Sequence, residues 1–335
     1  MRQVCFERFG GPEVLHIAEV PRPDPAAGEL RIRITAAGVN RADLAQREGS
    51  YAPPPGASQV LGLEVSGTVD AVGSGVSTSW IGQSVCSLTA GGGYAEWVCV
   101  PATLCMAPPS GFDMLEAAVF PEVAMTVWSN VFELGRLRPG ETLLVHGGTS
   151  GIGAFAIALA RALGHQVLAT AGDAIKCETM RGWGAAAINH RSQDFVQEVL
   201  AQTDGRGVDV VLDMVGGSYV ARNLSCLAMD GRVVQIAFLE GARAELDLMQ
   251  LMRRRAVLTG SLLRPRSDDE KAAIVRALEE HVFPLIANRQ LSRPVIDSVY
   301  PMEAAHEAHA RMANSAHIGK LVLTWDSSLL REAQH

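Results

Sequence analysis

An apolar run enters a glycine-rich turn in the stretch Thr142-Leu143-Leu144-Val145-His146-Gly147-Gly148-Thr149-Ser150-Gly151-Ile152-Gly153. Helix-forming residues follow from Ala154 to Leu163, and Gly164 ends this run. A strand that enters a helix through such a turn offers a phosphate close backbone approach, unpaired N–H groups and the positive end of the helix dipole. The turn departs from Gly-x-Gly-x-x-Gly because Ser150 fills one usual glycine position, but strand, turn and helix have the expected spacing. We therefore predict that a dinucleotide pyrophosphate is held by Gly147, Gly148, Ser150, Gly151, Ile152 and Gly153.

Beyond residue 123, apolar strand-length runs alternate with helix-length segments. The strands are almost wholly apolar, as in sheets covered on both faces, and strand–helix–strand repetition requires parallel pairing. Six strands in this rhythm predict an α/β fold with a doubly wound parallel sheet of the Rossmann type. The expected strands are 142–147, 166–171, 185–189, 208–213, 232–238 and 256–263, and the expected helices are 152–163, 173–183, 192–202, 217–228 and 246–255.

On either side of this region the sequence indicates a second, β-rich domain. Short β-branched runs are separated by glycine and proline clusters, which is typical of irregular β structure. We expect residues 123–263 to form a nucleotide domain inserted between two parts of the β-rich domain, 1–122 and 264–335. The tail contains a capping box at Ser267-Asp268-Asp269-Glu270 that opens a helix. The other expected elements are strands at 30–35, 65–69, 83–88, 95–100 and 320–324, and a helix over 302–314.

The end of the second strand discriminates between the two nicotinamide cofactors. NAD enzymes usually carry an acid there that binds the ribose 2′-hydroxyl, whereas this strand ends in Ala171-Gly172. Lys176 follows and can neutralise a 2′-phosphate, so we predict NADPH and place Gly172 and Lys176 at that phosphate. Asp173 is an unfavourable neighbour whose other role is to cap the next helix, and an ordinary exposed helix lysine is the alternative for Lys176.

Composition limits the classes of protein. The chain has 335 residues, of which 48% are hydrophobic and 19% charged, so it can bury a large core and is not mainly disordered. The net charge of −7 argues against nucleic acid as the main partner. The first residues lack the apolar core of a signal peptide, and no stretch approaches the about 18 apolar residues that span a bilayer. We therefore expect a cytoplasmic protein with no membrane partner. None of the six cysteines forms a Cys-x-x-Cys pair, so we expect buried free thiols.

Several further motifs make the whole chain resemble one family. They are Gly10-Gly11-Pro12-Glu13-Val14-Leu15, Gly38-Val39-Asn40-Arg41-Ala42-Asp43-Leu44, Pro53-Pro54-Pro55-Gly56-Ala57-Ser58, Leu61-Gly62-Leu63-Glu64, Gly260-Ser261-Leu262-Leu263-Arg264 and Ile318-Gly319-Lys320. With the glycine-rich turn, they resemble the zinc-independent quinone oxidoreductases of the medium-chain dehydrogenase/reductase superfamily, and in particular the p53-inducible quinone oxidoreductase type. The Asn-Arg-Ala-Asp and Pro-Pro-Pro-Gly blocks are specific to that group, whereas the glycine-rich pieces occur across the superfamily.

The resemblance implies a GroES-like domain combined with the Rossmann domain, and reduction of quinones by NADPH bound in the cleft between them. Relatives often carry a tyrosine after the third strand that contacts the 2′-phosphate. Here His190 holds that place, with Arg191 as a substitute donor, and a surface-turn histidine is the alternative. The remaining cofactor contacts that we expect are at Asn40, Tyr51, Thr126, Gly172, Lys176, Phe238, Lys320 and the 147–153 turn.

The same resemblance bears on metal binding. Zinc alcohol dehydrogenases carry a cysteine where Asn40 stands and Gly-His-Glu where Gly62-Leu63-Glu64 stands. A catalytic zinc needs three protein ligands, so we predict that this protein binds no metal. His306 and His309 have metal-like spacing, but they lie on an expected amphipathic helix, where we interpret them as surface or packing residues.

Quinones and conjugated enones accept hydride without a metal, whereas simple ketones need a polarised carbonyl. We therefore predict hydride transfer from NADPH to a quinone, with Asn40 and Tyr51 as catalytic residues. Tyr51 would hydrogen-bond the substrate oxygen, and the proton would come from Tyr51 or from water. The alternative for Tyr51 is a structural role. For Glu64, a structural role is the interpretation that we favour. An enone or enoyl reductase, or a non-catalytic NADPH-binding protein of the crystallin kind, are the alternative functions.

The uncharged run Ala256–Leu263 is expected to be the sixth strand and an edge of the sheet. An uncovered apolar edge invites association unless it is paired, and the resemblance implies pairing of such edges across a twofold axis. We therefore expect a homodimer or homotetramer.

Overall fold

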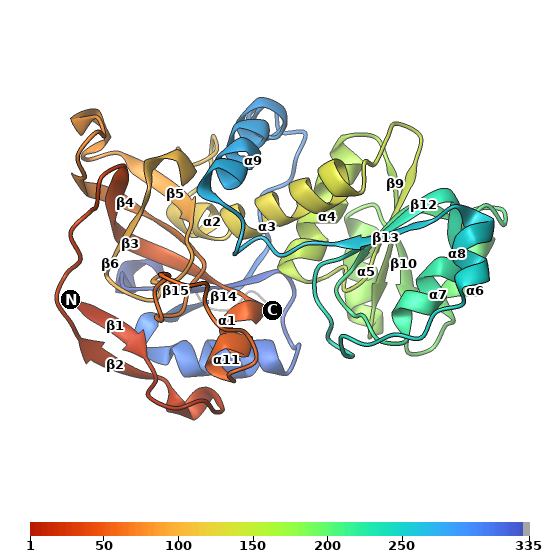
Figure 1. Ribbon diagram of the computed structural model, residues 1–335, viewed down its shortest axis with the longest axis horizontal. Helices are drawn as coiled ribbons and strands as arrows, with labels where there is room; N and C mark the ends of the chain where they lie inside the picture. Colours follow the sequence, from red (N-terminus) through yellow and green to blue (C-terminus); the bar gives the residue numbers. More distant parts are fainter. Residues whose placement is uncertain (331–335) are drawn as a thin grey trace. The chain divides into compact units, whose positions relative to one another are not determined.

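The computed structural model describes residues 1–330, which divide into two compact units. Unit 1 comprises Met1–Met125, Arg264–Arg289 and the described residues from Arg293 onward, and unit 2 comprises Thr126–Leu263 with Gln290–Ser292. The chain thus leaves unit 1 after Met125, builds unit 2, and returns to unit 1 at Arg264. Figure 1 labels most of the helices and strands of both units.

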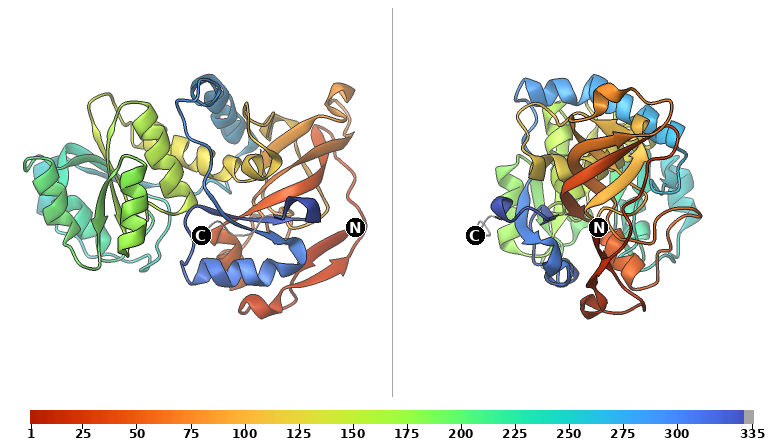
Figure 2. Two further views of the ribbon diagram at one scale, coloured as in Figure 1. Left: turned by 180° about the vertical axis from the view of Figure 1, so that it is seen from behind. Right: turned by 90° about the vertical axis from the view of Figure 1, so that its left-hand side faces the viewer.

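Unit 2 is built on a six-stranded parallel sheet in the order β10-β9-β8-β11-β12-β13. The order starts at β8 and runs outward in both directions, which confirms the predicted doubly wound Rossmann fold. Figure 2 shows its strands flanked by helices. The strands are β8 (Thr142–Val145), β9 (Gln166–Ala171), β10 (Ala186–Asn189), β11 (Val208–Asp213), β12 (Leu227–Gln235) and β13 (Val257–Gly260). The helices are α4 (Gly151–Ala162), α5 (Ala174–Gly182), α6 (Phe195–Gln202), α7 (Tyr219–Ser225) and α8 (Leu248–Arg254).

Two boundaries next to and within strand β12 differ from those that we expected from the sequence. The helix expected to reach residue 228 ends at Ser225, and β12 begins at Leu227 rather than at residue 232. Asp230 has a φ of 60° inside this strand, and the register with β11 is irregular. Asp230-Gly231 has the sequence of a turn, but aspartate tolerates the left-handed conformation that an irregular strand needs. The edge strand β13 is confirmed at the end of the sheet, although it is shorter than the expected 256–263.

Unit 1 contains a seven-stranded, mainly antiparallel sheet and a separate pair, β1-β2. The large sheet has the order β14-β15-β3-β4-β5-β7, and β6 also pairs with β3. Its central strand β3 pairs with β4, β6 and β15, so strands from both ends of the chain meet in one sheet, as predicted for a β-rich domain. The strands are β1 (Arg2–Cys5), β2 (His16–Glu19), β3 (Glu29–Val39), β4 (Glu64–Val72), β5 (Ser84–Leu88), β6 (Trp97–Pro101), β7 (Cys105–Met106), β14 (Ile296–Pro301) and β15 (Lys320–Thr324).

Helices of unit 1 follow the sequence signals only in the tail. Ser267 and Glu270 form the predicted capping box at the start of α9 (Asp268–His281). The expected helix 302–314 divides into a 3-10 turn, Met302–Ala304, and α11 (Ala305–Ala313). Local sequence patterns did not predict α1 (Arg41–Arg47), α2 (Met114–Ala118), α3 (Phe120–Val127), which crosses the division between the units, or α10 (Phe283–Ala287). They also did not predict the π-helical segment Trp128–Leu134 of unit 2.

All six cysteines are free, but the expectation of buried thiols is wrong for two of them. Cys5 and Cys99 are partly exposed, whereas the other four are buried. Across residues 1–330, none of the helices has the length and apolar character needed to cross a membrane.

Candidate functional site

The glycine-rich turn lies at the carboxyl end of β8 and runs into α4. Gly147 has a φ of 65°, which favours glycine, and a Cβ at Gly153 would collide with the Gly147 carbonyl oxygen. The Ser150 hydroxyl accepts a hydrogen bond from Gly153 N at 3.0 Å and caps α4. The residues predicted to hold a pyrophosphate therefore form one tight turn at a helix N-terminus, where the dipole favours an anion.

Gly172 follows β9 and faces the turn after β10. A Cβ at Gly172 would lie 3.2 Å from Arg191 Nε and 3.3 Å from His190 Nε2. Glycine thus leaves space beside two side chains that can donate hydrogen bonds. Burial, and secondly the charge of Arg191, lowers the pKa of His190, so the imidazole is neutral near pH 7 and Arg191 supplies the fixed positive charge. The structure brings these three candidate residues together.

Lys176 belongs to the first turn of α5, and Asp173 is the N-cap of that helix. The Asp173 carboxylate accepts a hydrogen bond from Lys176 N at 2.8 Å, which confirms its capping role. The positive end of the α5 dipole offsets part of the negative charge of Asp173. The Lys176 side chain is partly exposed on the same turn.

The other predicted cofactor residues of unit 2 have different surroundings. Thr126 is buried, and its carbonyl accepts a hydrogen bond from Asn130 Nδ2 at 2.8 Å. Phe238 lies in the loop after β12 with its side chain 57% exposed. Gln235 ends β12, and its buried Oε1 accepts no hydrogen bond from residues 1–330. Gln235 was not predicted from the sequence, because an unpartnered acceptor leaves no pattern there.

A network of buried, hydrogen-bonded polar side chains supports the carboxyl edge of the sheet, and the sequence did not reveal it. His146 bonds to Thr170 Oγ1 at 3.0 Å and to Asn223 Oδ1 at 2.7 Å. Asn223 Nδ2 donates to Asp213 Oδ2 at 2.9 Å, and Asp213 Oδ1 accepts two backbone N–H groups of the following turn. This network of hydrogen bonds links the carboxyl ends of β8, β9 and β11 beside the glycine-rich turn.

In unit 1, Lys320 bonds to Asn40, which stands where zinc alcohol dehydrogenases have a cysteine, and to Glu64, the last residue of the Gly62-Leu63-Glu64 segment. Its Nζ lies 2.6 Å from Asn40 Oδ1 and 2.6 Å from Glu64 Oε1. Asn40 Nδ2 also donates to Glu64 Oε1 at 3.1 Å, and all three side chains are buried. The Lys320 ammonium therefore gives Asn40 and Glu64 a cationic partner from the chain itself. The cofactor role of Lys320 stays a prediction.

A second network of buried hydrogen bonds holds the backbone of Asn40 in place. Asn40 N and Gly62 N donate to the Asp43 carboxylate at 2.8 and 2.9 Å. The Tyr94 hydroxyl donates to Asp43 at 3.2 Å and lies 3.1 Å from His309 Nε2. Burial raises the pKa of Asp43 to about 6 and lowers the pKa of His309 to about 3. His309 is thus a packing residue and not a surface residue.

Tyr51 lies in a loop beside a buried arginine. The Arg264 guanidinium stands over the Tyr51 ring at 5.5 Å. Arg264 Nε and Nη2 donate to Ala90 O at 3.0 and 2.7 Å, whereas its buried Nη1 has no hydrogen-bond partner within residues 1–330. Burial raises the pKa of Tyr51, so its hydroxyl is protonated near neutral pH. Arg264 ends one of the family motifs, but its position beside Tyr51 could not be predicted from the sequence.

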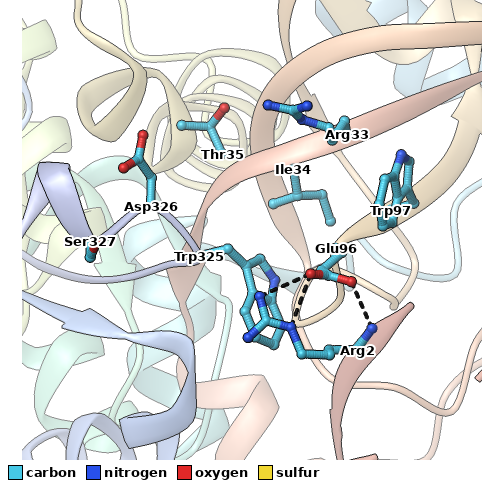
Figure 3. A pocket seen from close by; sticks show the side chains of 9 residues that line it. All are labelled: Arg2, Arg33, Ile34, Thr35, Glu96, Trp97, Trp325, Asp326 and Ser327. Carbon is cyan, nitrogen blue, oxygen red and sulfur yellow. Dashed lines mark hydrogen bonds and ion pairs between the residues drawn. The ribbon is translucent and has the colours of Figure 1, made fainter. Parts of the chain in front are cut away.

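A separate pocket of about 400 Å³ in unit 1 contains none of the predicted site residues. Figure 3 shows Arg2 beside Glu96 and Trp325 in its wall. Arg2 pairs with Glu96 at 2.9 Å and lies 4.5 Å from the centre of the Trp325 ring. We therefore place the candidate site at the clusters described above and not in this pocket. Its other lining residues are Arg33, Ile34, Thr35, Trp97, Asp326 and Ser327.

Known proteins match both units. The alcohol dehydrogenase GroES-like domain family matches residues 26–110, and the zinc-binding dehydrogenase family matches residues 183–323. The structure of Escherichia coli quinone oxidoreductase complexed with NADPH is 30% identical, with a TM-score of 0.86, and the match covers 97% of this chain and 100% of that one. This chain belongs to the medium-chain dehydrogenase/reductase superfamily.

The chain is also similar to an enoyl reductase and to one segment of a polyketide synthase. The JamJ enoyl reductase is 25% identical with a TM-score of 0.86, and the match covers 96% of this chain and 98% of that one. A mycocerosic acid synthase-like polyketide synthase of Mycobacterium tuberculosis is 33% identical over 316 residues, which cover 94% of this chain and 15% of the synthase. The chain thus spans about 15% of the length of the curated polyketide synthase that it matches.

One matching family is named for zinc binding. Within residues 1–330 of this superfamily member, no three His, Cys, Asp or Glu side chains form a group able to hold a metal. Metal independence itself stays a prediction.

Proposed function

We propose that this superfamily member is a metal-independent, NADPH-dependent quinone reductase of the p53-inducible type, working as a cytoplasmic homodimer. The observation that carries the proposal is the Lys320 ammonium bonded to Asn40 and Glu64. Asn40 replaces a zinc ligand and bonds to the Lys320 ammonium, which supports an acceptor conjugated enough to take hydride without a Lewis acid. The whole-chain likeness to a quinone oxidoreductase supports a quinone as that acceptor.

The carboxyl edge of the unit 2 sheet fits NADPH. The 147–153 turn would hold the pyrophosphate, and the space beside Gly172 would hold the 2′-phosphate between His190 and Arg191, near Lys176. When bound, NADPH supplies the hydride. We propose further cofactor contacts from Thr126, Phe238 and Gln235, whose free Oε1 suits a carboxamide N–H.

Asn40 and Tyr51 of unit 1 are the proposed substrate residues. Lys320 donates to the side-chain oxygen of Asn40, and Asp43 accepts from its backbone N–H, so Asn40 is held at its side chain and at its backbone. The Tyr51 hydroxyl donates its proton to the acceptor oxygen as negative charge develops there. The neighbouring charge of Arg264 counters the rise in the pKa of Tyr51 and favours the phenolate that remains.

The test is NADPH oxidation by the purified protein with a panel of quinones, acyclic enones and unsaturated thioesters. We expect the quinones to be reduced fastest, and the rates to survive exhaustive chelation. Loss of activity on chelation, restored by zinc alone, would contradict metal independence.

An enoyl reductase is the second candidate function, because the chain matches one segment of a polyketide synthase and a solved enoyl reductase. Faster reduction of an unsaturated thioester than of any quinone would establish this alternative. Tight NADPH binding with no turnover of any acceptor would instead indicate a non-catalytic binding protein.

A further inference from the structure

Strands β1 and β2 form a separate antiparallel pair in unit 1 (Figure 1). Val4 of β1 belongs to the hydrophobic core, and its register partner, Ile17 of β2, packs against that core. Side chains alternate between the two faces of a strand pair, so the next register partners, Cys5 and His16, lie on the opposite face. Cys5 is partly exposed and His16 is exposed, so small molecules in solution can reach both side chains.

A hydrogen bond joins the Cys5 thiol to the His16 ring. Cys5 Sγ lies 3.3 Å from His16 Nε2, and His16 Nδ1 lies 3.3 Å from Val14 O. Because a carbonyl oxygen only accepts hydrogen bonds, Nδ1 carries the proton of the neutral ring and Nε2 has the free lone pair. The thiol therefore donates to Nε2, and Val14 O holds the ring in the tautomer that can take the thiol proton. A nucleophile, a base and a group that orients the base together make an activated nucleophile.

The surroundings of Cys5 favour addition of an electrophile over oxidation. Burial, and secondly the charge of Glu7, raises the pKa of the Cys5 thiol. The thiol therefore keeps its proton near neutral pH and reacts only when a base removes that proton. Oxidation by peroxide selects thiols of low pKa, whereas a thiol of higher pKa is the stronger nucleophile once it is deprotonated.

We propose that Cys5 is a covalent modification site for conjugated carbonyl compounds, with His16 as the base that activates its thiol. His16 Nε2 takes the thiol proton while the sulfur bonds to the β-carbon of the carbonyl compound. The carbon–carbon π bond breaks, and its electrons form an enolate. The His16 imidazolium then returns the proton to the α-carbon, so the addition needs no oxidant, reductant or further reactant. This inference goes beyond the proposed function, because no residue of β1 or β2 belongs to the candidate site.

The rate of modification is measured with methyl vinyl ketone, which is added to the full chain at neutral pH without NADPH. Mass spectrometry of peptides then follows each cysteine separately. Cys99 is the internal reference, because its thiol is also partly exposed and burial raises its pKa to about 11. Cys5 should react at least about tenfold faster than Cys99, since a positioned base accelerates the loss of its proton. Equal rates at the two cysteines would overturn the inference.

His16→Gln removes the base and keeps a polar side chain. It should slow the modification of Cys5 by about a hundredfold and should leave the rate at Cys99 unchanged. His281→Gln makes the same change at an exposed position on α9 and should leave both rates unchanged. An unchanged rate at Cys5 in His16→Gln would show that the histidine does not activate the thiol, and the inference would be wrong. If His16→Gln unfolded the protein, the rate at Cys99 would rise, and His16→Asn would take its place.

The modification can be separated from acceptor reduction. Cys5→Ser should abolish the adduct on β1 and keep the wild-type rate of quinone reduction with NADPH. If the wild type reduces no acceptor, the proposed function is wrong, and the modification rates still decide the role of Cys5 because they are measured without NADPH.

Discussion

The Lys320 ammonium and the Glu64 carboxylate lie 2.6 Å apart in the interior of unit 1. Each is the other's counter-charge, and Asn40 bonds to both. Removing one member of a buried pair leaves an uncompensated charge, which destabilises a protein more than loss of the whole pair.

Lys320→Met should therefore lower the free energy of unfolding by about 3–5 kcal/mol, because Glu64 is left buried without its cation. Chemical denaturation followed by fluorescence gives this value. The double variant Lys320→Met/Glu64→Gln should recover part of the loss, since it removes both charges.

The exposed pair Arg255–Asp230 provides the matched comparison for that experiment. Arg255→Met should change the free energy of unfolding by less than about 1 kcal/mol, since exposed ion pairs contribute little. Equal losses in Lys320→Met and Arg255→Met would show that the buried pair has no special role.

Arg191 and Lys176 should determine the preference for NADPH over NADH. The arginine lies against Gly172 and the lysine opens α5 beside it, and a hydrogen bond to a charged partner contributes about 1.5–3 kcal/mol. Arg191→Ala and Lys176→Ala should each weaken NADPH binding by about tenfold to a hundredfold. Titration of both cofactors by fluorescence measures the effect.

NADH provides the internal control, because it lacks the 2′-phosphate and its affinity should be nearly unchanged in both variants. Arg181→Ala, an exposed cation at the other end of α5, should leave both affinities unchanged. Equal losses for NADH and NADPH would show that these residues do not bind the phosphate.

His309 should make the protein sensitive to acid. Arginine has no acceptor, so Arg47 donates to His309 Nδ1 at 3.1 Å and the neutral ring carries its proton on Nε2. Burial lowers the pKa of His309 from 6.5 to about 3. At pH values between these two pKa values, His309 is protonated in the unfolded chain but not in the folded protein. Stability therefore falls as the pH falls from 6.5 toward 3.

The slope from this one group reaches at most about 1.4 kcal/mol per pH unit. His309→Gln keeps a donor and an acceptor but cannot be protonated, so its stability should depend less on pH in this range. His306→Gln, on the exposed face of the same helix, should follow the wild type. Melting temperature as a function of pH measures all three proteins.

The sequence predicted the fold where local pattern and tertiary environment agree. β8 and β11 are buried along their whole length and are mainly apolar, so they could be recognised as parallel strands. The start of β12 was missed because Asp230-Gly231 forms an irregular strand in the structure and a turn in local sequence terms. Short helices such as α2 have few residues and little periodicity to reveal them.

The candidate site was predictable where one short segment builds it. The 147–153 turn is a single short segment, and its glycine pattern can be recognised in the sequence. The contacts of Lys320 with Asn40, and of Arg264 with Tyr51, join residues more than 200 positions apart. Such pairings depend on the order of strands in the sheet, which one sequence does not specify at the level of side chains.

The exposed edge of the unit 2 sheet should form a contact between two copies of the chain. Strand β13 is the last in its sheet, and Val257 and Leu258 on it are 49% and 38% exposed. Met252 of the preceding α8 is 66% exposed, so apolar side chains continue next to the edge. A charge on an edge strand opposes pairing, so Leu258→Lys should convert a dimer into a monomer at micromolar concentration, as measured by light scattering. Ile175→Lys, which charges a more exposed apolar residue on α5, should leave the dimer intact. A wild-type protein that is already monomeric at this concentration would contradict the prediction, and dissociation by Ile175→Lys alone would move the contact away from β13.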